Sequence, residues 1–470
     1  MLVTDLFNQN QLSPHLSKQA LFDLGVARQQ AVPSRELAAY VPVDRNPLDL
    51  IAATESQMLP DLLALRHQRM GVSPFTFFRG TAELMEHDLA EQSHSGIQVI
   101  ISGDAHVNNY GFYASPERKL LFGLNDFDEA RIGNWEDDLK RLLVSTYLAG
   151  QSNGFSERDL LPILTNVTRT YRHGVKYANA LILPERFYFS YEIHDMMATI
   201  DRISDDQPHK ISTILEKILK KSPQKNSEQV IAKLTTADEE GRRYFIEQAP
   251  RAKRVPQAIK DQLIRGYHRY LKNTREDVRV YLTNFTVDDV IRYAVGVGSF
   301  GTHCYLMLLS GNDGSHLVLQ IKEALPLRAS LTSLSSDRDL RLAQERSAGR
   351  RIVTAQKTLQ SASDPFLGAS HFGHRSYYFR QFRDMKESID VAKLDLESFG
   401  IYTATCAFLL AIAHFQSPTA PMIAGYLHHQ KPVDDTLADW AVQYAGQVNR
   451  DGSGAKIFSL NFCTRTLKKI

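Results

Sequence analysis

Residues 102–111 read SGDAHVNNYG, a stretch in which an acid, a histidine and two asparagines stand between two glycines. The run that leads into it, IQVIISGDAH, begins with apolar and β-branched residues and then meets Gly-Asp, which is typical of a buried strand entering a loop. Because these polar side chains offer little apolar surface to bury, the stretch indicates a functional loop. Taken alone, Asp-Ala-His is equally compatible with a turn around a satisfied histidine or with part of a metal site.

The spacing of polar residues in and after this loop suits chemistry on phosphates. Asp104 and Asn109 are five positions apart, and the apolar run LLFGLN ends at Asp126. An amide oxygen and a carboxylate suit Mg²⁺, which prefers oxygen ligands and takes phosphates as further partners. A second carboxylate that stays off the metal can accept a proton from an attacking hydroxyl. The kinase catalytic loop has this spacing, which predicts Asp104 as the base and Asn109 and Asp126 as metal ligands. Asp128 either helps to hold a second metal or caps the turn after Asp126.

A glycine-rich stretch much later in the chain, GVGSFG at 296–301, fits the pattern G-x-G-x-x-G. That pattern also serves dinucleotide-binding folds, where a helix follows the glycines. Here strand formers follow, the chain turns back through GNDG, and a second predicted strand, LVLQIK, ends at Lys322. Glycines between two strands with a lysine on the returning strand are the protein-kinase arrangement, in which backbone amides and the lysine contact the phosphates. The predicted nucleotide-binding residues are Gly296, Gly298, Ser299, Phe300, Gly301 and Lys322.

The combination of GDAHVNN, a strand and DFD resembles the aminoglycoside-phosphotransferase and choline-kinase branch of the kinase-like fold. The resemblance implies a catalytic role for the histidine two positions after the base, which is His106. It also implies that Asp138 braces the catalytic loop from the start of a helix; an acid placed there only by the helix dipole is the alternative. The blocks SPFTFFRGTAELM, LQIKEA, SASDPFLG and FRQFRDMK complete a resemblance to the bacterial family of domains of unknown function 2252, over about residues 20 to 420.

The order of the motifs differs from that of ordinary kinases, because Asp104 precedes Gly296. The apolar stretch 399–416 resembles the helix that normally leads into the catalytic loop. We therefore predict an α+β, two-lobed protein-kinase-like fold that is circularly permuted, with a small antiparallel β-rich nucleotide lobe and a larger, mostly helical lobe. The predicted divisions are an N-terminal helical segment packing on the large lobe (1–95), the catalytic loop and helical large lobe (96–290), the β-rich nucleotide-binding lobe (291–390) and C-terminal helices returning to the large lobe (391–470).

Two assignments have open alternatives. A kinase lysine normally pairs with a glutamate on the following helix, and that helix offers Glu345, with Gln356 as a second candidate. Arg79 in FFRG either contacts phosphate or substrate or is held structurally by a carboxylate or carbonyl. We expect the substrate pocket in the helical region 150–290.

The bulk composition narrows the class of protein. The chain has 470 residues, 55 basic against 53 acidic side chains and three cysteines, which gives no case for a nucleic-acid partner or a disulfide framework. The run CAFLLAIA is far shorter than the roughly 20 residues of a membrane span. We expect a cytoplasmic protein without a membrane partner, and the oligomeric state stays open. The expected function is ATP- and Mg²⁺-dependent phosphoryl transfer to a small-molecule hydroxyl or amine. The alternatives are nucleotidyl transfer (AMPylation) to a protein and a non-catalytic nucleotide-binding module.

Overall fold

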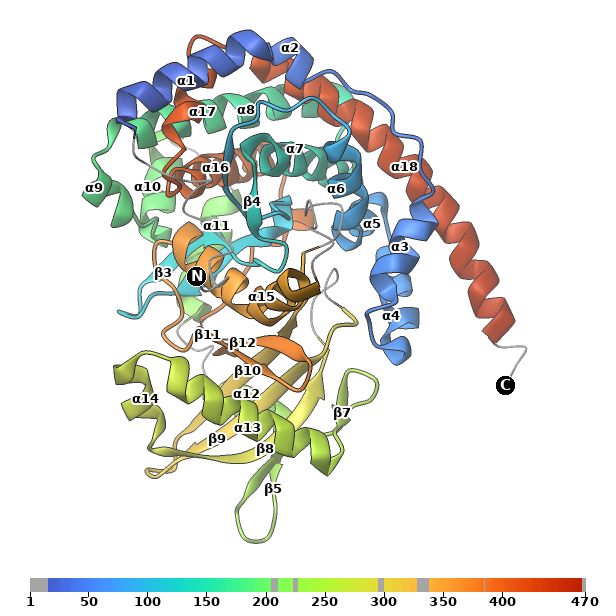
Figure 1. The fold of residues 1–470 in the computed structure, drawn as a ribbon, viewed down its shortest axis with the longest axis vertical. Coiled ribbons are helices and arrows are strands. Elements are labelled where there is room, and N and C mark those ends of the chain that lie inside the picture. Colours follow the sequence, from blue (N-terminus) through green and yellow to red (C-terminus); the bar gives the residue numbers. More distant parts are fainter. Residues whose placement is uncertain are drawn as a thin grey trace.

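The chain forms a larger, mostly helical part and a smaller part built on one antiparallel sheet, which gives a mixed α+β architecture (Figure 1). The computed structural model describes residues 16–203, 210–222, 227–294, 300–327, 338–383 and 385–466.

The smaller part is a six-stranded sheet in the order β11-β12-β10-β9-β8-β7, with antiparallel pairing throughout. Its strands are β7 (Ala252–Arg254), β8 (Phe285–Tyr293), β9 (Cys304–Gly311), β10 (His316–Ala324), β11 (Gly368–Phe372) and β12 (Arg375–Gln381). The hairpin predicted around GNDG is confirmed as β9 and β10, in which Leu317 pairs with Leu309. The sheet also takes in β7 and β8, which begin before residue 291, the predicted start of the β-rich lobe. Their apolar alternation is interrupted by two acids, one of which, Asp289, binds Arg254 and the backbone N–H of Phe245.

Both faces of this sheet are covered, and the alternation of side chains along β9 shows how. Tyr305, Met307 and Leu309 face α13 (Gln257–Asn273) and α14 (Glu276–Leu282). Leu306 and Leu308 lie on the other face, in a cluster with α12 (Ser227–Leu234). Successive residues of a strand point to opposite faces, so a continuous apolar run fits a strand buried on both sides.

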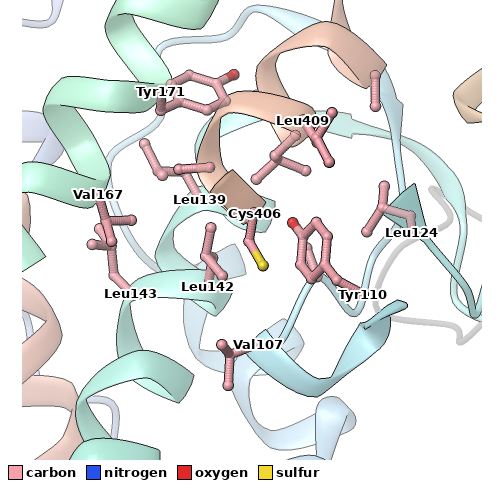
Figure 2. Close-up of a cluster of buried hydrophobic side chains, with 14 of the residues drawn as sticks. Val107, Tyr110, Leu124, Leu139, Leu142, Leu143, Val167, Tyr171, Cys406 and Leu409 are labelled. Carbon is pink, nitrogen blue, oxygen red and sulfur yellow. The ribbon is translucent and has the colours of Figure 1, made fainter. Parts of the chain in front are cut away.

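The larger part surrounds a core formed by four long helices. These are α7 (Trp135–Ser152), α8 (Glu157–Ala180), α16 (Leu396–His414) and α18 (Val433–Thr466). Figure 2 shows that side chains of the loop region, Val107 and Tyr110, enter the same core as Leu142 and Cys406. The apolar residues of SGDAHVNNYG therefore anchor it, and its polar residues are left for other contacts.

Helix α16 is the one described helix that is long and apolar enough to cross a membrane. It is longer than the apolar run in the sequence suggests, but most of it is buried inside the protein, where it packs against α8. Its apolar character is thus accounted for by its central position in the core.

The N-terminal helices bring residues 18–90 against the rest of the molecule (Figure 1). They are α1 (Lys18–Ala31), α2 (Ser34–Leu37), α3 (Pro47–Glu55), α4 (Pro60–Met70), α5 (Pro74–Gly80) and α6 (Ala82–Ala90). Asn46 caps α3, since its Oδ1 accepts a hydrogen bond from Leu48 N at 3.1 Å, and Pro60 starts α4.

Short elements complete the fold. In the larger part β1 (Gln98–Ile101) pairs with β4 (Arg131–Asn134), and β2 (Tyr110–Ala114) pairs with β3 (Leu120–Leu124). The remaining elements are η1 (Val107–Asn109), α9 (Leu183–Phe187), α10 (Ile193–Ile203), α11 (Lys210–Lys221), β5 (Thr235–Ala237), β6 (Arg243–Phe245), α15 (Arg338–Leu359), η4 (Val391–Lys393) and α17 (Pro421–Tyr426).

Candidate active site

The first turn of α7 holds the loop after β1 through backbone hydrogen bonds. Asp138 accepts hydrogen bonds from Ser102 N at 2.7 Å and from Gly103 N at 2.9 Å. On its other side Asp138 lies 3.3 Å from His414 Nε2, and His414 Nδ1 is hydrogen-bonded to Tyr171. Asp138, His414 and Tyr171 are buried, so the backbone N–H groups of Ser102 and Gly103 have a fixed acceptor that water does not readily replace. Asp138 therefore braces the loop, and His414 is a satisfied core histidine.

Gly103 and Asn109 bring the loop after β1 close to the segment that carries Asp126 and Glu129. Gly103 has φ +75°, and a Cβ there would clash with the carbonyl oxygen of Glu129. Asn109 Nδ2 donates to the carbonyl oxygens of Asp104 (2.8 Å) and Asp126 (3.0 Å). A carbonyl can only accept, so these contacts fix the amide orientation and turn Asn109 Oδ1 to the opposite side.

Asp104 makes an ion pair that the sequence reasoning missed. Arg141 Nε donates to Asp104 Oδ1 at 2.8 Å, and the Arg141 side chain is only 3% exposed. Burial raises the pKa of Asp104 to about 7, with Arg141 lowering it and the negative charges of Glu129 and Asp126 raising it further. The available signal was helical spacing, since Arg141 lies one turn after Asp138 on α7 and faces the same loop.

His106 is placed beside Asp104 but is not bonded to it. Its Nε2 lies 3.7 Å from Asp104 Oδ2, which is too long for a hydrogen bond. Burial and the positive charges of Arg79 and Arg141 hold the pKa of His106 well below its ordinary value, so the ring is neutral. Its buried Nδ1 has no hydrogen-bond partner in the part of the chain that the structure describes.

Lys322, on β10, meets the acids that follow β3. Its ammonium contacts Asp128 directly and lies 3.9 Å from Asp126 Oδ1. Asp128 also accepts a hydrogen bond from the Tyr378 hydroxyl at 2.9 Å. Burial opposes the charge of Lys322, but the two carboxylates raise its pKa well above the ordinary value. The lysine and Asp126 thus come together across about two hundred residues of sequence, and in this structure Asp128 is the direct partner of Lys322.

The other predicted nucleotide-binding residues are placed only in part. Gly296, Gly298 and Ser299 lie outside the described residues. Phe300 is fully buried under the Arg69 guanidinium, with 4.3 Å from its Cζ to the ring centroid. Gly301 has φ +125° and accepts a hydrogen bond from Leu59 N at 2.7 Å. These two residues therefore attach the end of the loop to α4 and the residue before it.

The predicted partners of Lys322 on α15 are not seen beside it. The Glu345 side chain lies outside the described part of the structure, and Gln356 Nε2 donates to Gln360 instead. The contact from α15 to the site is made by Arg351, which donates to the carbonyl oxygens of Asp128 and Leu325, both at 3.0 Å, and to that of Ala130. An arginine on this helix thus positions the backbone that carries the acids.

A cavity of about 600 Å³ brings these groups together. One wall consists of residues from α3 to α6, including Arg79. The opposite wall consists of the loops with Asp104, His106, Asn109, Asp126 and Asp128. The sheet part contributes Thr302, Glu323 and residues 325–327, and Lys386 lies at the edge. No residue from 150–290 lines this cavity within the described part of the chain; its helical wall comes from the N-terminal helices, and a separate cavity is lined by residues between 157 and 169.

The donor set fits a magnesium ion that brings phosphates with it. Asp126 Oδ1 is buried and has no hydrogen-bond partner among the described residues, and Asn109 Oδ1 is turned away from the carbonyls that its amide nitrogen binds. The charges of Lys322, Arg380 and Lys386 outweigh burial and lower the pKa of Asp126, so it is ionised. Among the described residues no three His, Cys, Asp or Glu side chains form a metal-binding group. Mg²⁺ commonly binds through one or two protein oxygens plus phosphates and water, and these two ligands meet that requirement.

Comparison with known proteins gives one match. The model of a family described as an uncharacterised protein conserved in bacteria, DUF2252, matches residues 58–452. No curated protein and no solved structure matches the chain. The matched span includes Lys322 and the cavity-lining residues from Met58 onward, whereas Leu50, Ala53, Thr54 and Gln57 precede it.

Proposed function

The chain belongs to the bacterial family DUF2252, and from the arrangement of its cavity we propose that it is an ATP- and Mg²⁺-dependent phosphotransferase acting on a small-molecule hydroxyl or amine. The observation that carries the proposal is the convergence of four groups from distant segments. Asp104, Asn109 and Asp126 line one wall of the cavity, and Lys322 reaches Asp126 and Asp128 from the sheet. This is the set that phosphoryl transfer requires: a base, two metal ligands and a cation for the phosphates.

The connectivity of the sheet supports a permuted kinase-like fold. The glycine-rich stretch lies between β8 and β9, Lys322 stands on β10, and the long helix α15 follows that strand. Kinases use the same succession of glycine loop, lysine strand and helix. Strand β12 then leads through η4 into α16, which packs on α7, while the catalytic loop itself comes from the N-terminal half. These positions agree with a kinase-like chain whose original ends are joined.

Each residue has a distinct task in the proposed reaction. Asp104 accepts the proton of the attacking hydroxyl, for which a pKa near 7 is suitable. Arg141 orients that carboxylate, and Asp138 holds the loop beneath it. Lys322 contacts the phosphates of ATP. Asn109 and Asp126 would hold Mg²⁺, which neutralises phosphate charge when it is bound. Catalysis is then mainly positioning and electrostatic stabilisation.

The wall formed by α3 to α6 favours a small acceptor. It faces the catalytic loop across a cavity of about 600 Å³, which must hold the terminal phosphates as well as the acceptor. That volume is in the ordinary range for small-molecule sites, and a folded protein acceptor would have to approach past these helices. The geometry therefore favours phosphoryl transfer to a small molecule over nucleotidyl transfer to a protein.

Calorimetric titration of ATP with and without Mg²⁺ tests the proposal. We expect Mg²⁺-dependent binding by the wild type, weakened about tenfold or more in Lys322→Met and Asp126→Asn, because each loses a charged contact to the phosphates or the metal. Lys119→Met and Asp277→Asn, at exposed positions, are the matched controls and should bind like the wild type. Asp104→Asn should retain binding and lose transfer. Folded wild-type protein that binds no nucleotide would sink the proposal, and a transferred mass of AMP in place of phosphate would identify the other reaction.

A further inference from the structure

The wall of the cavity formed by α3 to α6 carries a guanidinium that has no hydrogen-bond or ion-pair partner among the described residues. Arg79 is the next-to-last residue of α5 and lines the cavity. Within the described part of the chain it forms no hydrogen bond or ion pair, and its Nε is buried without an acceptor. Burial lowers its pKa, although an arginine remains protonated at any physiological pH. Its Cζ lies 5.7 Å from the centroid of the Phe75 ring, but among the described residues no carboxylate or carbonyl holds it, as one would hold a structural arginine.

The backbone around Arg79 is fixed on both sides. The carbonyl oxygen of Phe78 accepts a hydrogen bond from Arg141 Nη2 at 2.9 Å. The carbonyl oxygen of Gly80 accepts one from Arg66 Nη2 at 2.6 Å. The start of α5 is closed by a reciprocal cap between Ser73 and Thr76. The Arg79 side chain therefore leaves a rigid segment, as a preorganised binding group requires.

The charges near Arg79 locate it along the line of transfer. Its guanidinium interacts electrostatically with both Asp104 and Asp126. Asp104 is the proposed base, which lies beside the attacking oxygen, and Asp126 is the proposed metal ligand, which lies beside the phosphates. A group passing from ATP to the acceptor moves between these two carboxylates. Arg79 thus lies on the cavity wall and interacts electrostatically with the carboxylate at each end of the proposed transfer.

We propose that Arg79 contacts the phosphoryl group during transfer and stabilises its transition state, an assignment that rests on the proposed function. In this step the acceptor oxygen forms a bond to the γ-phosphorus and the bond from the γ-phosphorus to the oxygen that bridges it to the β-phosphate breaks. ADP leaves with the electron pair of that bond, and the acceptor proton goes to Asp104. The three equatorial oxygens carry the charge in the transition state, and the planar guanidinium can donate to two of them. No atom or electron is gained or lost by Arg79.

The test compares two complexes of the same protein. Mg²⁺ with a non-hydrolysable ATP analogue represents the ground state, and Mg²⁺–ADP with aluminium fluoride represents the transferring phosphoryl group. Arginines that act in this way are worth about 10³–10⁵ in rate. We therefore expect Arg79→Met to weaken the aluminium fluoride complex at least about 100-fold while changing affinity for the analogue by less than about threefold, with Arg79→Lys in between. Arg275→Met, at an exposed ion pair on α14, is the control and should change neither.

The outcomes separate this inference from the proposed function. If the wild type binds both complexes and Arg79→Met weakens both equally or neither, Arg79 is not a transition-state group, although the protein still binds ATP. Loss of both complexes with an unchanged circular dichroism spectrum would place Arg79 in ordinary ground-state binding and overturns the assignment as well. If the folded wild type binds neither complex, the proposed function fails and the inference fails with it.

Discussion

The ionisation of Asp104 can be shifted by changing a single contact, the ion pair with Arg141. In the wild type we expect kcat/KM to fall about tenfold per pH unit below the Asp104 pKa of about 7 and to level off above it, because only the carboxylate can accept a proton. The positive charge of Arg141 lowers the pKa of Asp104. Replacing Arg141 with Met removes that charge, so the pKa of Asp104 should rise. The pH dependence should therefore move to higher pH, and activity lost at pH 7 should return at pH 9 to 10.

The expected size follows from the geometry. The Arg141 Nε to Asp104 Oδ1 distance is 2.8 Å, and two unit charges whose centres lie about 4 Å apart interact by roughly 4 kcal/mol at an effective dielectric constant of 20. That energy corresponds to about three pKa units at 1.36 kcal/mol per unit. Water that enters the space left by the guanidinium group compensates for part of it. We expect an upward shift of about one to three units in Arg141→Met, and less than about one unit in Arg141→Lys, which keeps the charge.

The measurement that does not depend on the acceptor is ¹³C NMR of protein labelled at aspartate carboxyls. The Asp104 resonance is identified by its absence in Asp104→Asn and followed between pH 5 and 10 in the wild type, Arg141→Lys and Arg141→Met. Phosphoryl transfer at the same pH values then shows whether activity follows the same titration. An Asp104 resonance that titrates near pH 4, or one whose midpoint is the same in Arg141→Met as in the wild type, would refute the electrostatic account.

Two further predictions concern stability. Because the pKa of Asp104 is higher in the folded protein (about 7) than in the unfolded chain (about 3.9), its contribution to the free energy of unfolding is fully present below about pH 4 and falls by about 4 kcal/mol as the pH rises to about 7. Urea unfolding at several pH values should show this fall in the wild type but not in Asp104→Asn, and equal pH slopes in the two proteins would contradict it. Gly103→Ala should lower the free energy of unfolding by more than about 3 kcal/mol, because it combines a positive φ with a clash at the Glu129 carbonyl. Gly154→Ala has a similar φ with open space around it and should cost about 1 kcal/mol, so equal thermal shifts in the two variants would mean that the close approach at Gly103 is unimportant.

The sequence predicted those parts of the molecule whose signals are local. The strand before SGDAHVNNYG and the β9–β10 hairpin follow from apolar runs and turn residues, and the structure has both. Strand β8 was not predicted, because Asp288 and Asp289 interrupt its apolar pattern. In the structure Asp289 is paired with Arg254 and accepts a hydrogen bond from a backbone N–H. A buried acid with a partner elsewhere in the chain looks, in the sequence, like a solvated one.

The same limitation explains why the acids and the amide of the candidate site could be assigned from the sequence, whereas Arg141 was missed and Arg79 kept two alternatives. Asp104, Asn109 and Asp126 lie in short polar loops after apolar strands, and such a pattern is costly unless the polar groups are used, so it is visible in the sequence. Arg79 and Arg141 lie on helices, where an arginine every few residues is ordinary. Their roles depend on which way those helices face, and that is decided by packing between segments such as α5 and α7. Motifs thus identify the segments that carry the acids and Lys322, and they name Arg79 with two alternatives, whereas the ion pair between Arg141 and Asp104 becomes visible only when distant helices are placed in space.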